Sequence, residues 1–294
     1  MRLGFYTYSY TDRLRMPLEP CLQRVARAGY SGIDISGTDG TSANPKSVSS
    51  DLRRLTRRTA ERLGLVIEAV ITHAPLTDSL VDADREPLDL EGTVELAVDV
   101  GADVVTFHMG GYPAGVTREE FWEALVARIQ DAADYAAARR VFLAVDGIWP
   151  DWVDDSPQTL ERLFQDVGSP VFGVNFDPCY LMLMGLDPAA FARRFASRIV
   201  HAHLKDHVGR YSNWTHVIPG RGEMAYAKVF SALREINFAR SCSVECFTNM
   251  PFAEACDDGF RAMNAAAQKA GVRFEPSPHR LPPARIEHEA VPLD

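Results

Sequence analysis

The sequence is poor in cysteine and lacks both a long apolar run and a secretory leader pattern. Its five cysteines, an odd number, include no Cys-x-x-Cys pair. No apolar segment approaches the ~20 residues needed to span a bilayer, and the amino terminus has no basic region followed by an apolar stretch. We therefore expect a reduced, cytoplasmic protein that has no role at a membrane.

An excess of positive charge is also missing. The 31 Lys and Arg residues face 40 Asp and Glu residues, which gives a formal net charge of −9. Affinity for nucleic acid depends on neutralising phosphates with Lys and Arg, so this balance argues against nucleic acid as a partner. Basic residues at positions 53, 54, 57 and 58 have helical spacing and indicate a solvated helix face.

What the chain does have is enough apolar residues, 46% of 294, for a large core. Strand-like and helix-like segments alternate along it. The expected strands are 3–6, 32–35, 66–72, 104–107, 141–145, 171–176, 199–204 and 241–246, and the expected helices are 17–28, 48–63, 90–100, 118–139, 157–167, 188–195, 225–236 and 252–270. This alternation predicts an α/β fold, a (β/α)8 TIM barrel forming one domain over residues 1–272, rather than an open doubly wound sheet.

Local signals support two of the helix boundaries. Gly29 follows the first expected helix, where tolerance of positive φ suits a helix end. Thr117 is expected to cap the amino end of helix 118–139, with Glu119 and Glu120 in its first turn. Residues 78–87 are expected to form a loop.

The last segment of the chain, 273–294, is proline-rich and lacks apolar periodicity. We expect an extended C-terminal tail that lies across the barrel or across a partner subunit, or that is disordered in isolation.

Candidate metal ligands stand at the ends of four consecutive expected strands. Asp146, Asp177, His203 and Glu245 each lie at or near the end of a short apolar run. The carboxyl ends of parallel barrel strands share one face, so we expect these groups to converge on one divalent metal. Singly, they have simpler explanations, because Asp before Pro is a common turn, a buried Glu can be an ion pair and a lone His is more often structural.

Three motifs carry a resemblance: Asn175-Phe176-Asp177-Pro178, His201-Ala202-His203-Leu204-Lys205-Asp206 and Pro219-Gly220-Arg221-Gly222-Glu223. Over residues 1–272 the chain resembles the xylose-isomerase-like TIM barrel superfamily. That superfamily includes sugar and sugar-phosphate isomerases, ketose 3-epimerases, inosose dehydratases and DNA-repair enzymes of the endonuclease IV type. The resemblance implies metal ligands at Asp177, His203 and Glu245, and at Asp146, where the family usually has glutamate.

Two further departures separate the branches of the superfamily. Tyr180 stands where many members have a histidine three residues after the strand-six aspartate. The endonuclease branch resembles this chain at His73, His108 and His216, but it needs an aspartate where this chain has Trp214. A three-metal cluster for phosphodiester cleavage is therefore not expected.

The expected site is oxygen-rich, which suits Mn²⁺ first and Mg²⁺, Co²⁺ or Zn²⁺ as alternatives. A bound metal would polarise the carbonyl of a sugar or polyol substrate and stabilise an enediolate. Resemblance to the epimerase members implies that Asp146 and Glu245 also transfer protons, with His108 and Lys205 as further catalytic candidates. Lys205 shares a strand face with His203, and its alternative role is an ion pair with a carboxylate.

Substrate contacts are expected from aromatic and imidazole side chains near strand ends, although such residues also serve as packing. The candidates are His73, Trp149, Tyr180, Trp214, His216 and Arg221. Arg221 lies in a Gly-x-Gly turn and could bind a phosphate or carboxylate, but such a turn is weak evidence for phosphate.

Three functions stay open at this point. The first is a metal-dependent sugar or polyol isomerase or epimerase that works through an enediolate. The second is a lyase or dehydratase that starts with the same proton abstraction and then expels a leaving group. The third is a non-catalytic barrel, or a subunit active only with a partner. We expect a small-molecule substrate and a homo-oligomer, with a hetero-oligomer as the alternative.

Overall fold

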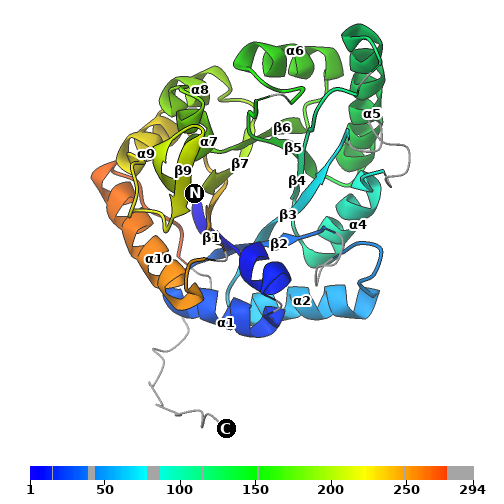
Figure 1. Cartoon of the computed structure of the whole chain (residues 1–294). Helices are drawn as coiled ribbons and strands as arrows, with labels where there is room; N and C mark the ends of the chain where they lie inside the picture. Colours follow the sequence, from blue (N-terminus) through cyan, green and yellow to red (C-terminus); the bar gives the residue numbers. More distant parts are fainter. Residues whose placement is uncertain are drawn as a thin grey trace.

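The computed structural model describes residues 1–14, 16–38, 44–77, 87–113, 115–150, 152–247 and 249–276. Eight parallel strands close into one barrel in the order β1-β10-β7-β6-β5-β4-β3-β2, with helices around it (Figure 1). They are β1 (Arg2–Tyr6), β2 (Gly32–Ser36), β3 (Val66–Pro75), β4 (Val104–His108), β5 (Phe142–Asp146), β6 (Phe172–Phe176), β7 (Ile199–Leu204) and β10 (Ser241–Glu245). The predicted TIM barrel is confirmed.

The predicted helices are all present, with ends shifted by two residues at most. They are α1 (Leu18–Ala28), α2 (Ser50–Arg62), α4 (Leu90–Val100), α5 (Arg118–Ala138), α6 (Pro157–Val167), α8 (Pro188–Arg194), α9 (Tyr226–Glu235) and α10 (Phe252–Lys269). Most of the expected loop 78–87, and the tail beyond residue 276, lie outside the described residues.

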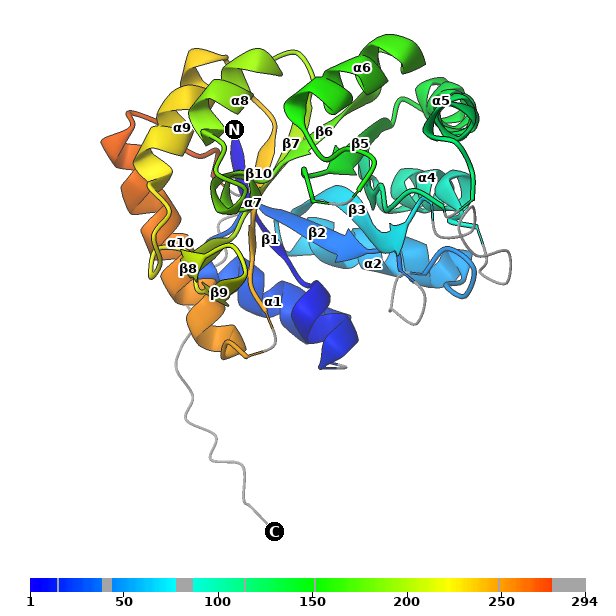
Figure 2. The ribbon, with the colours of Figure 1, turned by 45° about the horizontal axis from the view of Figure 1, so that its top comes forward.

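Three elements were not predicted. A π-helical turn, η1 (Ser9–Arg13), follows β1, and the short helix α7 (Pro178–Leu183) follows β6. An antiparallel hairpin of β8 (Asp206–Arg210) and β9 (Asn213–Val217) extends the chain beyond β7 and lies beside α7 (Figure 2). All three follow strand ends, so they build the rim of the barrel mouth.

Local chemistry explains the helix boundaries. Thr117 Oγ1 accepts a hydrogen bond from the Glu120 N–H, and the Glu120 carboxylate accepts one from the Thr117 N–H, which forms the capping box of α5. Helix α1 ends at Gly29, whose φ is +107°. A Cβ atom there would lie 2.7 Å from the Phe260 ring, so the position requires glycine for space as well as for conformation.

The main core lies between the barrel and its helices, and it is apolar. A smaller apolar cluster lies apart from it, made of Tyr6, Ala69, Ile71, Val104, Ala144 and Val200. Buried polar residues are also present, and they follow the period of two along the strands. On β7, His201 and His203 are 1% and 0% exposed, and Lys205, two residues further on, is 2% exposed.

The amino-terminal end of the barrel is closed by charged pairs. Arg2 pairs with the buried Glu68. Glu275, in the described part of the expected tail, accepts from the Met1 ammonium at 2.8 Å and from Arg2 at 3.0 Å. The chain after α10 therefore returns to its own amino terminus. Within the described residues, no helix is both long and apolar enough to cross a bilayer.

Candidate active site

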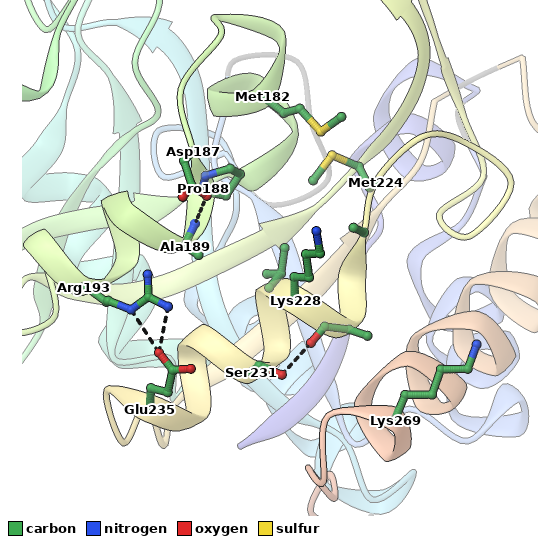
Figure 3. A pocket seen from close by; sticks show the side chains of 13 residues that line it. Met182, Asp187, Pro188, Ala189, Arg193, Met224, Lys228, Ser231, Glu235 and Lys269 are labelled. Atoms are coloured by element: carbon green, nitrogen blue, oxygen red, sulfur yellow. Dashed lines mark hydrogen bonds and ion pairs between the residues drawn. The ribbon is translucent and has the colours of Figure 1, made fainter.

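A cavity of about 510 Å³ opens at the carboxyl ends of the barrel strands. It is lined by Tyr8, Ser9, Arg13, His73, His108, Asp146, Tyr180, Lys205, Glu245 and Phe247. A second cavity, of about 710 Å³, lies on the outer wall between α8 and α9, where Arg193 pairs with Glu235 (Figure 3). The outer cavity is larger but contains no strand-end residue. The barrel mouth, with its convergent titratable groups, is therefore the candidate site.

Lys205 lies at the base of the barrel cavity. Its Nζ is 2.6 Å from Asp177 Oδ2 and 2.9 Å from Glu245 Oε2, and it sits 4.6 Å from the centre of the Tyr180 ring. Burial disfavours the ammonium, but the carboxylates outweigh it and raise the pKa of Lys205 well above its usual value. Lys205 is thus a charged group that pairs with two barrel carboxylates.

The other predicted ligands continue the same cluster. His203 Nδ1 lies 3.0 Å from Glu245 Oε2. The Asn175 amide donates to Asp146 Oδ1 at 2.7 Å and lies 3.0 Å from His203 Nδ1. The four predicted ligands are therefore neighbours, with Lys205 and Asn175 between them.

The electrostatics of the cluster are set by its two cations. Burial alone would raise the pKa of each carboxyl, but Lys205 holds the pKa of Asp146 below and that of Glu245 well below the usual range. For Asp177 burial prevails and its pKa is raised. Burial disfavours charge on His203 as well, yet Glu245 and Asp34 raise its pKa to about 10. With these pKa shifts, the site holds an imidazolium and an ammonium among its carboxylates.

Two more histidines line the cavity and are neutral. Burial lowers the pKa of His73 to about 3, and burial also lowers that of His108. The His73 Nε2 lies 2.6 Å from the Tyr6 hydroxyl, and the His108 Nε2 lies 3.6 Å from Asp146 Oδ2. Neutral imidazoles can both donate and accept hydrogen bonds, which suits contact with substrate hydroxyls.

The predicted aromatic contacts form one wall beside Lys205. Tyr180 lines the cavity, and its ring centre is 4.6 Å from that of Trp149 and 6.3 Å from that of Trp214. His216 stacks on Phe247 at 4.0 Å. Tyr180 and Phe247 line the cavity, whereas the predicted substrate contacts Trp149, Trp214 and His216 do not line it and instead contact those two rings.

Arg221 is placed differently. It forms ion pairs with Glu254 and Asp258 on α10 and does not line the cavity. The backbone N–H groups of Gly220 and Gly222 in its turn donate to the Asp206 carboxylate, and a Cβ on Gly222 would collide with Asp206. The Gly-x-Gly turn thus wraps a carboxylate of the chain itself.

The donor set of the predicted metal site fits a divalent cation in type, because it offers three buried carboxylates and an imidazole. No three of its four members bring ligand atoms within 4.8 Å of one another. The Lys205 ammonium lies between two of them, 2.6 Å from Asp177 Oδ2 and 2.9 Å from Glu245 Oε2. An ammonium held by two buried carboxylates marks a position built for positive charge, so the residues fit a cation with Lys205 as the group that has to move.

Sequence reasoning missed several residues of this region. Ser9 and Arg13 reach the cavity mouth on η1, a short turn with no apolar periodicity. Asn175 was part of a motif but had no assigned role. Asp34 and His201 lie deeper in the barrel and, with His203, are the only described group of three such residues whose ligand atoms lie within 4.8 Å of one another. The feature of the sequence that could have indicated a functional Asp34 is its position as a charged residue between two isoleucines.

Comparison with known proteins shows which family the chain belongs to. The chain is 31% identical to the rhizopine catabolism protein MocC of Rhizobium meliloti over 202 residues, which are 65% of this chain and 58% of MocC. It is 21% identical to inosose dehydratase 2 of Bacillus cereus over 281 residues, which are 86% of this chain and 90% of that protein.

Solved structures share the fold. D-psicose 3-epimerase, crystallised in the presence of D-fructose, matches with a TM-score of 0.75 at 16% identity, over 92% of this chain and 100% of the epimerase. The IolI protein with a bound zinc atom matches with a TM-score of 0.73 at 17% identity, over 92% and 98% of the two chains. The family model described as xylose isomerase-like TIM barrel matches residues 22–270, and the chain therefore belongs to that family, as its motifs predicted.

Proposed function

We propose that this protein is a divalent-metal-dependent isomerase or epimerase of a sugar or related polyol. One observation carries the proposal. Three buried carboxylates (Asp146, Asp177 and Glu245), His203 and Lys205 meet at the base of a cavity at the carboxyl ends of the barrel strands. The shared fold of D-psicose 3-epimerase supports this assignment.

In this proposal Asp146, Asp177, His203 and Glu245 would hold the metal, with Lys205 displaced from between two of them. A divalent ion held there would supply positive charge to polarise a substrate carbonyl and to stabilise the negative charge that develops when the neighbouring carbon loses its proton. We propose Mn²⁺ as the ion, with Mg²⁺, Co²⁺ or Zn²⁺ as alternatives that the same ligands accept. The zinc atom of the IolI structure supports a divalent ion in a barrel of this fold.

The proton-transferring pair is Asp146 and Glu245. Their strands, β5 and β10, are separated in the barrel by β6 and β7, so the two carboxylates approach the cavity from different sides. Epimerisation needs this arrangement, because one group removes the proton from the carbon and the other returns a proton to the opposite face. Turnover therefore needs one of the two carboxyls ionised, to accept the proton from the carbon, and the other protonated, to return one.

The second candidate is a dehydratase that starts with the same proton abstraction. His108 favours it, because this imidazole lies beside Asp146 at the cavity wall and, after taking up the proton that Asp146 removes from the substrate carbon, can pass that proton to the departing hydroxyl. The similarity to inosose dehydratase 2 over most of both chains also supports it. Both candidates use the same ligands and the same first step.

The test is proton exchange measured by NMR in D₂O. Purified protein is stripped of metal, reloaded with Mn²⁺ and incubated with ketohexoses and with inososes. Exchange of the proton next to the carbonyl, with appearance of the epimer or isomer, is the expected result. Loss of water in place of an epimer would select the dehydratase. A protein that binds no divalent ion and exchanges no proton would refute both.

A further inference from the structure

Below the cavity, the barrel interior holds a carboxylate that the proposed chemistry does not use. Asp34, on β2, is 0% exposed. Its Oδ2 lies 2.9 Å from His201 Nε2 and 3.7 Å from His203 Nε2. Burying a carboxylate is unfavourable unless hydrogen-bonding or charged partners compensate for the lost water. The two imidazoles are the partners that the fold supplies to Asp34.

The state of each nitrogen around Asp34 follows from what a carboxylate can do. An ionised carboxylate only accepts hydrogen bonds, so His201 Nε2 carries the proton in the 2.9 Å contact. His201 therefore anchors the Asp34 carboxylate on one side, and His203 lies on the other.

The two ring nitrogens of His203 face different groups. Nδ1 lies 3.0 Å from Glu245 Oε2, at the base of the cavity. Nε2 faces down the barrel toward Asp34 Oδ2, at 3.7 Å, and has no hydrogen-bond partner among the described atoms. Asp34 is thus the acceptor placed against the nitrogen that does not face the cavity.

We propose that Asp34 is a positioning residue that takes the Nε2–H of His203 and so presents His203 Nδ1, as a free lone pair, to the metal. This inference rests on the proposed function. Metal-binding imidazoles usually donate their second N–H to a carboxylate, which fixes the tautomer and the ring orientation and strengthens the ligand. His201 completes the arrangement, since its hydrogen bond holds the Asp34 carboxylate in place beneath His203.

The main variant is Asp34→Asn, which keeps the size of the side chain and removes its charge. We expect Mn²⁺ binding, measured by titration calorimetry, to weaken by roughly 10- to 100-fold, the range found when such supporting partners are changed. The matched control is Glu68→Gln, a buried carboxylate on β3 that pairs with Arg2 at the other end of the barrel. Its Mn²⁺ affinity should match that of the wild type.

Variants of His201 separate positioning from general damage. Gln at position 201 can still donate a hydrogen bond to Asp34, whereas Phe cannot. We expect His201→Gln to keep Mn²⁺ affinity within a few-fold of wild type and His201→Phe to weaken it by about tenfold or more. Equal affinities in His201→Gln and His201→Phe would contradict a role that acts through Asp34.

A measurement on the wild-type protein does not depend on variants that fold. Long-range ¹H–¹⁵N NMR of protein loaded with diamagnetic Zn²⁺ should show His203 protonated at Nε2 and metal-bound at Nδ1. The opposite assignment, or two ions per chain of which Asp34→Asn loses one, would overturn the positioning role. Wild-type protein that binds no metal would instead refute the proposed function, whereas wild-type binding that Asp34→Asn leaves unchanged would refute this inference alone.

Discussion

Lys205 Nζ lies 2.6 Å from Asp177 Oδ2 in an ion pair that is almost wholly closed to solvent. The same ammonium reaches Glu245, so one lysine neutralises two of the proposed metal ligands. Removing one partner of a buried ion pair usually costs about 3–5 kcal/mol, because the other charge is left uncompensated. Lys205 therefore stabilises the ion-free protein and competes with any cation for the same oxygens.

We expect Lys205→Met to destabilise the ion-free protein and to bind Mn²⁺ more tightly, since the competing ammonium is gone. The loss of stability should be about 3–5 kcal/mol without metal, and added Mn²⁺ should restore most of it. Denaturant unfolding with and without Mn²⁺ and titration calorimetry measure both effects. Lys228→Met, an exposed lysine on α9 (Figure 3), is the control. Weaker Mn²⁺ binding by Lys205→Met would mean that the lysine supports the ion.

Asp146 is the ligand that departs from the glutamate usual at its position. We expect Asp146→Asn to weaken Mn²⁺ binding by about tenfold or more and to abolish turnover, because a neutral amide is a poorer ligand and no base. Asp146→Glu should keep measurable activity. Metal content and proton exchange in D₂O are measured on the same samples. Full metal content in Asp146→Asn would exclude Asp146 from the ligand set.

We expect the buried carboxyl of Asp154 to make the free energy of unfolding depend on pH. It is 0% exposed, and its carboxyl has no hydrogen-bond partner in another described residue. Burial raises the pKa of Asp154 well above its usual value, so the folded state binds its proton more tightly than the unfolded state. Stability from this group is therefore present below the unfolded pKa of ~3.9 and is lost as pH rises toward the folded pKa.

Asp154→Asn should accordingly be more stable than wild type by about 1–3 kcal/mol at pH 8 and nearly equal to it at the lowest pH at which both fold. Urea unfolding across that pH range measures the difference. The exposed neighbouring variant Asp155→Asn should leave the pH profile of wild type unchanged. A constant difference between Asp154→Asn and wild type at every pH would show that the carboxyl does not titrate in this way.

Arg13 stands at the cavity mouth, where its Nε donates to the Tyr8 hydroxyl at 2.9 Å. It touches none of the carboxylates at the base. We expect Arg13→Gln to raise KM by roughly three- to tenfold, about 1 kcal/mol for one exposed contact, and to leave kcat unchanged. Steady-state kinetics with Arg27→Gln, an exposed arginine on α1, as control decide this. A fall in kcat at unchanged KM would place Arg13 in the chemistry.

DNA cleavage is the activity that His73, His108 and His216 would suggest by resemblance to the endonuclease branch. Cleavage by a metal cluster needs several ions to stabilise the attacking and leaving oxygens, and Tyr180 and Trp214 occupy two of the ligand positions. A net charge of −9 also offers little counterion release on a duplex. We expect no incision of an abasic-site duplex by Mn²⁺-loaded protein in a gel assay, with a competent endonuclease as positive control.

The strands and the strand-end residues could be predicted because both follow from a period of two and from apolar runs of fixed length. The hairpin of β8 and β9 could not. Its turn, Tyr211-Ser212, has Ser212 at a φ of +74°, where a hairpin signal would have glycine or asparagine. The hydrogen bond from the Gly220 N–H to the Asp206 carboxylate could not be predicted either, since it joins residues that are distant along the chain.

Within the site, sequence spacing predicted which strand ends carry ligands but not how their side chains pair. Lys205 is long and flexible, so its position between Asp177 and Glu245 depends on buried charge rather than on spacing. The sequence did not single out Asp34, because the expected strand 32–35 was identified from its apolar residues alone. Its pairing with His201 needs the closed barrel, which brings β2 and β7 to face each other.

Three polar residues alternate along β7 and the residue that follows it, and this has an evolutionary consequence. His201, His203 and Lys205 alternate with Ala202 and Leu204, which belong to the apolar core. Insertion or deletion of one residue before His201 would turn all three polar side chains into that apolar layer. Point substitutions can therefore change the chemistry of this strand one residue at a time. Insertion or deletion of a single codon would instead displace His201, His203 and Lys205 together.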